Sequence, residues 1–143
     1  MNIKELSFFM ANRPGSMAKI TQMLAEKKID IRALSLAENG GYGVLRLIVR
    51  NPDEAESALK EAGVNVLKND VIAVSVADRP GEFSRAVQAL AEASVNIEYM
   101  YAFLSRNDGE AVVILRTDNL QAASAALTAQ GVRLLGANEV YNL

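Results

Sequence analysis

Apolar and polar positions alternate in two similar stretches of the chain, and each stretch predicts a β-strand with one buried face. The apolar positions are Leu6, Phe8 and Met10 near the N-terminus and Ile72, Val74 and Val76 in the middle of the chain. After each stretch the apolar residues recur at helical spacing, which predicts helices over residues 15–27 and 81–93.

Two further strands and a second helix follow in each half of the chain. In the first half, strands are predicted over residues 31–37 and 44–50, and Asn39-Gly40-Gly41 between them is typical of a hairpin. The next helix opens at Asn51-Pro52-Asp53, with Pro near the first helical position, and ends at Gly63. The second half predicts strands over residues 97–104 and 111–117 and a helix from Asp118 to Gly131, and short strands close the halves at residues 64–67 and 132–135.

The order of elements recurs because the sequence repeats itself. Asn12-Arg13-Pro14-Gly15 returns 66 residues later as Asp78-Arg79-Pro80-Gly81, and Ile29-Asp30-Ile31 returns as Val95-Asn96-Ile97. Beyond that point the offset is 68 residues, so we expect a longer hairpin over residues 105–110. The boundary lies near Asn69 and Asp70, which gives two domains, residues 1–69 and 70–143.

The order βαββαβ, present twice, predicts an α+β protein made of two ferredoxin-like units, each an antiparallel sheet with its helices on one face. We expect Leu45, Leu47 and Val49 to lie under the helices. The opposite face of that strand, with Ile48, is partly apolar, so we expect another unit or chain to cover it. The tail over residues 138–141 is expected to add a strand.

The composition of the chain excludes several kinds of catalytic and metal site. The chain has no Cys and no His, which excludes disulfides, thiolate nucleophiles, Cys/His zinc sites and Ser-His-Asp triads. Lys plus Arg total 15 against 17 for Asp plus Glu, so we expect no nucleic-acid partner. No apolar run reaches the roughly 18 residues that a membrane span needs. An early acid, Glu5, and the lack of a signal-like apolar segment favour a cytoplasmic location. We expect no enzyme activity, metal or cofactor.

The turn after the first strand of each half offers the best candidate chemistry. Gly15 lets the backbone turn tightly and lets a ligand approach. The first-turn amides of the following helix lack helical partners and suit a carboxylate, while the side chain of Asn12 or Asp78 can accept a hydrogen bond from an ammonium group. The alternative is purely structural, because Pro-Gly turns preceded by Asn or Asp are common helix starts.

The repeated unit of about 70 residues, with N-R-P-G after the first strand and I-D-I or V-N-I after the first helix, resembles the ACT domain. ACT domains are small regulatory modules that bind amino acids, and the resemblance covers nearly the whole chain. It implies a free-standing tandem ACT protein, and we expect it to be a homodimer that binds a free amino acid.

The resemblance also implies which residues contact the ligand. In the first copy they are Asn12, Gly15, Ser16 and Met17 at the turn, with Asp30 and Ile31 after the first helix. In the second copy they are Asp78, Gly81, Glu82, Phe83 and Asn96. Neither copy carries Asn at both of the family's positions, so the copies are expected to differ in ligand or occupancy.

The preferred function is therefore a non-catalytic amino-acid sensor. One alternative is a regulatory subunit of an amino-acid biosynthetic enzyme such as acetolactate synthase, which would co-purify with its catalytic subunit. Another is an ACT-like module that serves only in assembly. A small enzyme on a ferredoxin-like scaffold is disfavoured, because no His, Cys or recognisable acid pair is available.

Overall fold

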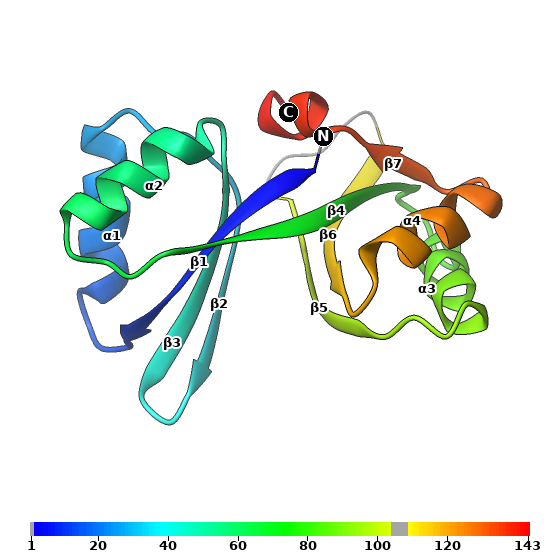
Figure 1. The fold of residues 1–143 in the computed structure, drawn as a ribbon, viewed down its shortest axis with the longest axis horizontal. Coiled ribbons are helices and arrows are strands. Elements are labelled where there is room, and N and C mark those ends of the chain that lie inside the picture. The colour runs from blue at the N-terminus through cyan, green and yellow to red at the C-terminus, as the bar shows by residue number, and fades with distance from the viewer. Residues whose placement is uncertain (1, 104–108) are drawn as a thin grey trace. The chain divides into compact units, whose positions relative to one another are not determined.

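The computed structural model describes residues 2–103 and 109–143 (Figure 1). The longer hairpin expected over residues 105–110 lies for the most part outside the described residues. The described residues divide into two compact units. The first unit consists of Lys4–Asn69 and Asn142, and the second unit contains the other described residues.

The first unit is an antiparallel sheet with two helices on one face. Its elements are β1 (Ile3–Ala11), α1 (Ser16–Glu26), β2 (Ile31–Asn39), β3 (Tyr42–Val49), α2 (Pro52–Glu61) and the start of β4 (Leu67–Ala77). β3 lies between β2 and β1, and Leu47 is opposite both Leu6 and Leu34. Asn69, at the start of β4, donates a hydrogen bond to Ser7 on β1.

The second unit repeats this arrangement. Its elements are the rest of β4, α3 (Glu82–Glu92), β5 (Ile97–Ala102), β6 (Glu110–Thr117), α4 (Leu120–Ala129), β7 (Arg133–Leu135) and α5 (Ala137–Tyr141). The strand order is β5-β6-β4-β7, and all neighbouring strands are antiparallel. The helices match in length between the units, with 11 residues in α1 and α3 and 10 in α2 and α4.

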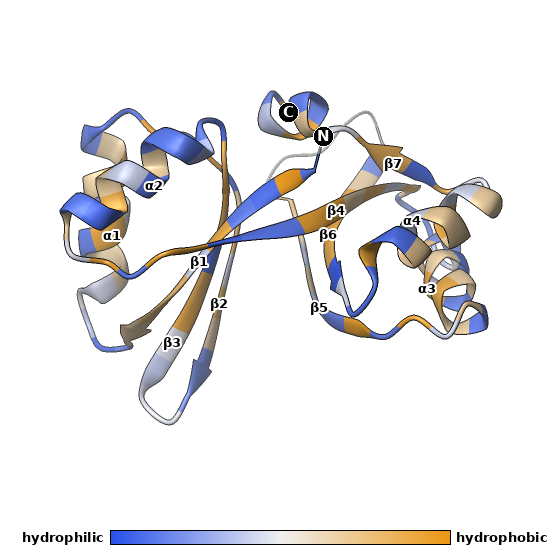
Figure 2. Ribbon diagram, in the orientation of Figure 1, coloured by the Kyte–Doolittle hydropathy of each residue, from blue (hydrophilic) through white to orange (hydrophobic). Residues whose placement is uncertain are grey.

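Each unit has its own hydrophobic core between the sheet and the two helices. In the first unit, side chains from β1, β3, α1 and α2 form it, among them Leu6, Leu24, Leu45, Leu47, Val49 and Leu59. The second core contains the corresponding Val74, Leu90, Leu115 and Leu127. Figure 2 shows hydrophobic residues along β3 and hydrophilic ones over much of α2, which contacts solvent on its outer side. The predicted α+β class and the placement of Leu45, Leu47 and Val49 under the helices are confirmed.

The strand predicted over residues 64–67 is wrong in its extent. The first copy closes with β4, which begins at Leu67 and continues without a break to Ala77. Lys68 binds the carboxylates of Asp53 at 2.8 Å and Glu56 at 3.2 Å on α2. The hydrogen bond to Lys68 lowers the pKa of Asp53, and the same bond raises the pKa of Lys68. These contacts hold the start of β4 against α2.

The strand expected over residues 138–141 is also wrong, because the tail forms the short helix α5. Ala137 and Val140 are both buried and lie one helical turn apart. The amide of Gly136 donates to the Glu139 carboxylate at 3.1 Å, and Arg133 pairs with the same carboxylate at 2.6 Å. Glu139 therefore stabilises the helix start rather than an extended chain.

We predict that Leu59→Ala lowers the free energy of unfolding by about 2–5 kcal/mol, because Leu59 is fully buried in the first core and its loss leaves a cavity. Urea unfolding followed by circular dichroism measures this. Leu67→Ala is the matched control, because Leu67 is 55% exposed and its loss should change stability by about 0.5 kcal/mol or less. Equal losses in both variants would contradict the assigned core.

Candidate functional site

The turn between β1 and α1 is held in one conformation by short-range hydrogen bonds. Gly15 has φ +91°, a left-handed conformation that side chains rarely adopt. The amide of Asn12 donates to the Gly41 carbonyl at 2.9 Å, which ties the turn to the β2–β3 hairpin. The Ser16 hydroxyl donates to the Ala11 carbonyl at 2.8 Å and so closes the turn on itself.

The turn between β4 and α3 has the same backbone. Gly81 also has φ +91°, and the amide of Asp78 donates to the Gly109 carbonyl at 3.0 Å. The two turns differ in the residue that starts the helix. Ser16 bonds to the preceding strand, whereas Glu82 forms an ion pair with Arg79 at 3.3 Å.

An open hollow of about 640 Å³ lies beside the first turn. Residues from the end of β1, the turn and the first two turns of α1 line it: Met10, Ala11, Arg13, Pro14, Gly15, Ser16, Ala18, Lys19, Ile20 and Gln22. A Cβ added to Gly15 would meet no atom within 4 Å, so this position leaves free space that a ligand can use. The volume is of the size that small-molecule sites have.

The N-terminal amides of α1 are available to an anion. The amide of Ser16 donates to the Arg13 carbonyl at 3.1 Å, and the amide of Lys19 donates to Gly15 at 3.0 Å. Within the described residues, the amides of Met17 and Ala18 have no acceptor, and no side chain caps the helix. Unpaired amides at a helix start carry positive partial charge and bind carboxylates well.

A small residue on β3 permits the close approach of Leu36. A Cβ on Gly43 would lie 2.7 Å from Cδ1 of Leu36, which is too close, and 3.6 Å from Cβ of Asn12, which is an ordinary contact. Gly43 therefore lets Leu36 lie over the strand. Gly43 was not among the predicted site residues, and its place depends on the register of β3 with β1, where it is opposite Met10.

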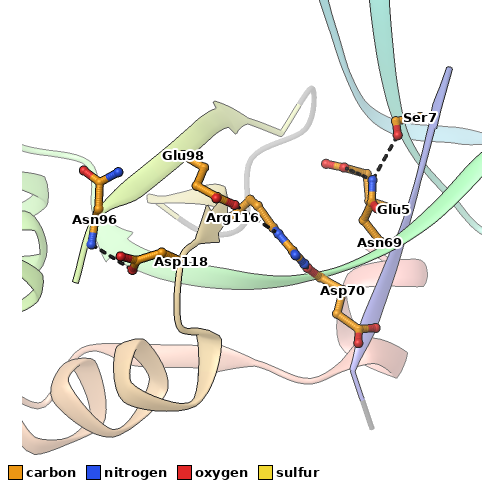
Figure 3. Close-up of polar contacts among 8 residues, drawn as sticks. All are labelled: Glu5, Ser7, Asn69, Asp70, Asn96, Glu98, Arg116 and Asp118. Carbon is orange, nitrogen blue, oxygen red and sulfur yellow. Dashed lines mark hydrogen bonds and ion pairs between the residues drawn. The ribbon is translucent and has the colours of Figure 1, made fainter. Parts of the chain in front are cut away.

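The residues that follow α1 and α3, Asp30 and Asn96, make different interactions. Asp30 binds Arg32 at 2.8 Å and Arg50 at 3.6 Å, so an ammonium group must compete with two cations for its carboxylate. In the second unit the backbone N–H of Asn96 donates to the Asp118 carboxylate at 3.0 Å (Figure 3). Asp118 corresponds in the repeat to Arg50, so the charge beside this position changes sign between the copies.

Some of the expected site residues line the hollow, and others pack against the hydrophobic cores. Gly15 and Ser16 line the hollow, whereas Asn12 does not, although it stands in the chain between two lining residues, Ala11 and Arg13. Met17, Ile31 and Phe83 are half-buried and pack against the hydrophobic cores of their units. Asp78, Gly81 and Glu82 form the second turn, and Asn96 is exposed after α3.

Two cationic residues that line the hollow, Arg13 and Lys19, were not among the predicted site residues. A signal existed for Lys19, because it lies four residues after Gly15 and residues at that spacing share a helix face. Among the described residues, no group of three or more acidic side chains could hold a metal ion. No helix in the described part of the chain is long and apolar enough to cross a membrane.

The family model of the ACT domain pair matches residues 1–142, and the chain belongs to that family. The solved structure of protein BT0572 from Bacteroides thetaiotaomicron is 36% identical, with a TM-score of 0.92 over 100% of this chain and 98% of that chain. The regulatory subunit of aspartate kinase from Thermus thermophilus is 21% identical, with a TM-score of 0.65 over 91% of this chain and 93% of that one. The regulatory subunit of aspartate kinase from Thermus flavus is 20% identical, with a TM-score of 0.61 over 92% of this chain and 94% of that one.

These two regulatory subunits share the fold of this chain. None of the curated proteins compared with the chain matches it.

We predict that Ser16→Ala lowers the free energy of unfolding by about 0.5–1.5 kcal/mol, because the Ala11 carbonyl then loses its hydroxyl donor. Thermal and urea unfolding measure the change. Ser84→Ala is the matched control, since Ser84 lies near the start of α3 and its exposed hydroxyl only accepts a bond from Gln88. A Ser16→Ala variant as stable as the parent would show that the bond does not fix the turn.

Proposed function

We propose that this ACT domain pair is a non-catalytic regulatory protein that binds a free amino acid at the turn between β1 and α1. The observation that carries the proposal is the hollow beside Gly15. Gly15 has no side chain, and a Cβ built there would meet no described atom within 4 Å. The free amides of Met17 and Ala18 offer a place for the α-carboxylate. We assign the ammonium group to the side-chain oxygen of Asn12, which stands in the same turn.

The second turn supports ligand binding less well. Glu82 places a carboxylate in the first turn of α3, where its negative charge interacts favourably with the helix dipole and opposes the approach of a ligand carboxylate. Arg79, the counterpart of Arg13, is already paired with Glu82. We therefore assign the amino acid to the first turn. Contacts by Asp78, Gly81, Glu82, Phe83 and Asn96 stay predictions for a second site of different preference.

Regulation follows if the ligand binds one assembly of the protein more tightly than another, because only a difference in affinity can shift an equilibrium. We propose an enzyme of amino-acid biosynthesis as the regulated partner. The regulatory subunits with the same fold make this class of partner worth testing. Affinity purification of the intact protein, followed by identification of a co-purifying enzyme, tests it.

We also propose that the chain forms a homodimer through sheet edges. β2 is the edge strand of the first unit and β5 is an edge strand of the second. An edge strand leaves backbone groups available for pairing with another chain. Each strand carries an exposed apolar side chain, Leu36 at 39% and Met100 at 49%, beside one exposed acid, Glu38 on β2 and Glu98 on β5.

We predict that the amino acid that binds, found by a thermal-shift screen of the twenty, loses at least tenfold in affinity in Gly15→Val. The valine side chain would fill the open space beside the turn, and the stabilisation by a bound ligand grows with the logarithm of its concentration divided by Kd. Calorimetry on the purified variants measures the constants. Gly81→Val is the matched control, because it carries the same φ of +91° in the other turn and so the same backbone strain.

Equal affinity in Gly15→Val and the parent would remove the first turn as the site. A loss in Gly81→Val alone would move the site to the second turn. If none of the twenty amino acids binds, the protein is an assembly module and the proposed sensor function is wrong.

We predict a dimer in sedimentation equilibrium, and a shift toward monomer when Lys replaces Leu36 and Met100 together. A lysine at an edge strand opposes pairing with another strand. Ser57→Lys on α2 is the control, since it adds the same charge to a helix surface. A parent protein that sediments as a monomer at all concentrations would contradict the proposed dimer.

A further inference from the structure

Among the described residues that line the hollow beside the first turn, two are cationic and none is acidic. Arg13 comes from the turn and Lys19 from the second turn of α1. Neither has an ion-pair partner within residues 2–103 and 109–143. The first turn of α1 also contains no acid that would offset them.

In the second copy, the charge at the first of these two positions is compensated. Arg79 stands where the first copy has Arg13, and it binds Glu82, which stands where the first copy has Ser16. The two turns share their backbone, so the free charge at the first turn is not required by the fold. Because the fold does not need this uncompensated positive charge, we attribute it to ligand binding.

The charge of the ligand follows from the charge of the hollow. An amino acid with a neutral side chain has no net charge, and its one carboxylate would leave the two cations of the hollow largely uncompensated. A ligand with a second carboxylate carries a net charge of −1 and matches the site better, because complementary charge decides between ligands of similar shape. Arg is suited to this role, since its guanidinium binds a carboxylate through two parallel hydrogen bonds.

We propose that the first site is specific for an amino acid with an acidic side chain, of the aspartate or glutamate class. This inference rests on the proposed function. The α-carboxylate takes the amides of Met17 and Ala18, and the side-chain carboxylate takes Arg13 and Lys19. Arg13 and Lys19 are thus the residues that determine specificity.

The test compares acids with their amides, which have nearly the same shape. Calorimetry on the full-length protein measures the affinities of L-aspartate against L-asparagine and of L-glutamate against L-glutamine, at low and at moderate salt. We expect one acid to bind at least tenfold more tightly than its amide, with a preference that decreases as salt rises.

Substitutions then show which side chains cause the preference for the acid over its amide. Arg13→Gln and Lys19→Gln should each reduce the ratio of acid to amide affinity by about fivefold or more, and the double variant should abolish it. Arg79→Gln and Arg85→Gln are the matched controls, because these arginines hold the corresponding positions in the second copy, and they should leave the ratio unchanged.

The outcomes separate this inference from the proposed function. An amide that binds as tightly as its acid, or a neutral amino acid that binds more tightly than both acids, overturns the inference and leaves the sensor function intact. Failure of all twenty amino acids overturns both. Binding of glutarate as tightly as glutamate also overturns both, because the site would then ignore the ammonium group.

Discussion

The left-handed conformation of one glycine is the constraint on which the candidate site depends. Gly15 turns the chain from β1 into α1 within a few residues, and only a residue without Cβ adopts φ +91° without strain. The helix therefore starts a few residues after the strand ends, and within the described residues the amides of Met17 and Ala18 have neither an acceptor nor a capping side chain. The open space, the unpaired donors and the nearby Asn12 all result from this single turn.

The two copies separate what the fold requires from what a ligand requires. Both turns keep the same φ at glycine and the same hydrogen bond to the neighbouring hairpin. They differ in side chains that the backbone does not need, namely Ser16 against Glu82 and a free Arg13 against a paired Arg79. Function on a shared fold is decided by such side chains, so one duplicated scaffold can present two turns of the same backbone and different charge.

The sequence predicted local features well and spatial ones poorly. Alternation and helical spacing are properties of neighbouring residues, so the strands, the helices and the core position of Leu47 could be predicted. The ion pair of Asp30 with Arg50 depends on the register of two strands, and the packing of Gly43 against Leu36 depends on a rotamer. Neither leaves a periodic signal. The long β4 was missed because polar residues separate its two apolar parts.

The continuity of β4 makes the two copies share one strand with no linker. Asn69 ends the segment Lys4–Asn69 of the first unit and donates to Ser7 there, while the carbonyl of Asp70 accepts a bond from Arg116 in the second unit (Figure 3). Side chains alternate between the faces of a strand, so a single residue inserted between Asn69 and Asp70 would reverse the facing of the later residues of β4 relative to the earlier ones, unless a β-bulge absorbed it. Two inserted residues would preserve the alternation. The length of this junction therefore changes more easily by pairs of residues than by single ones.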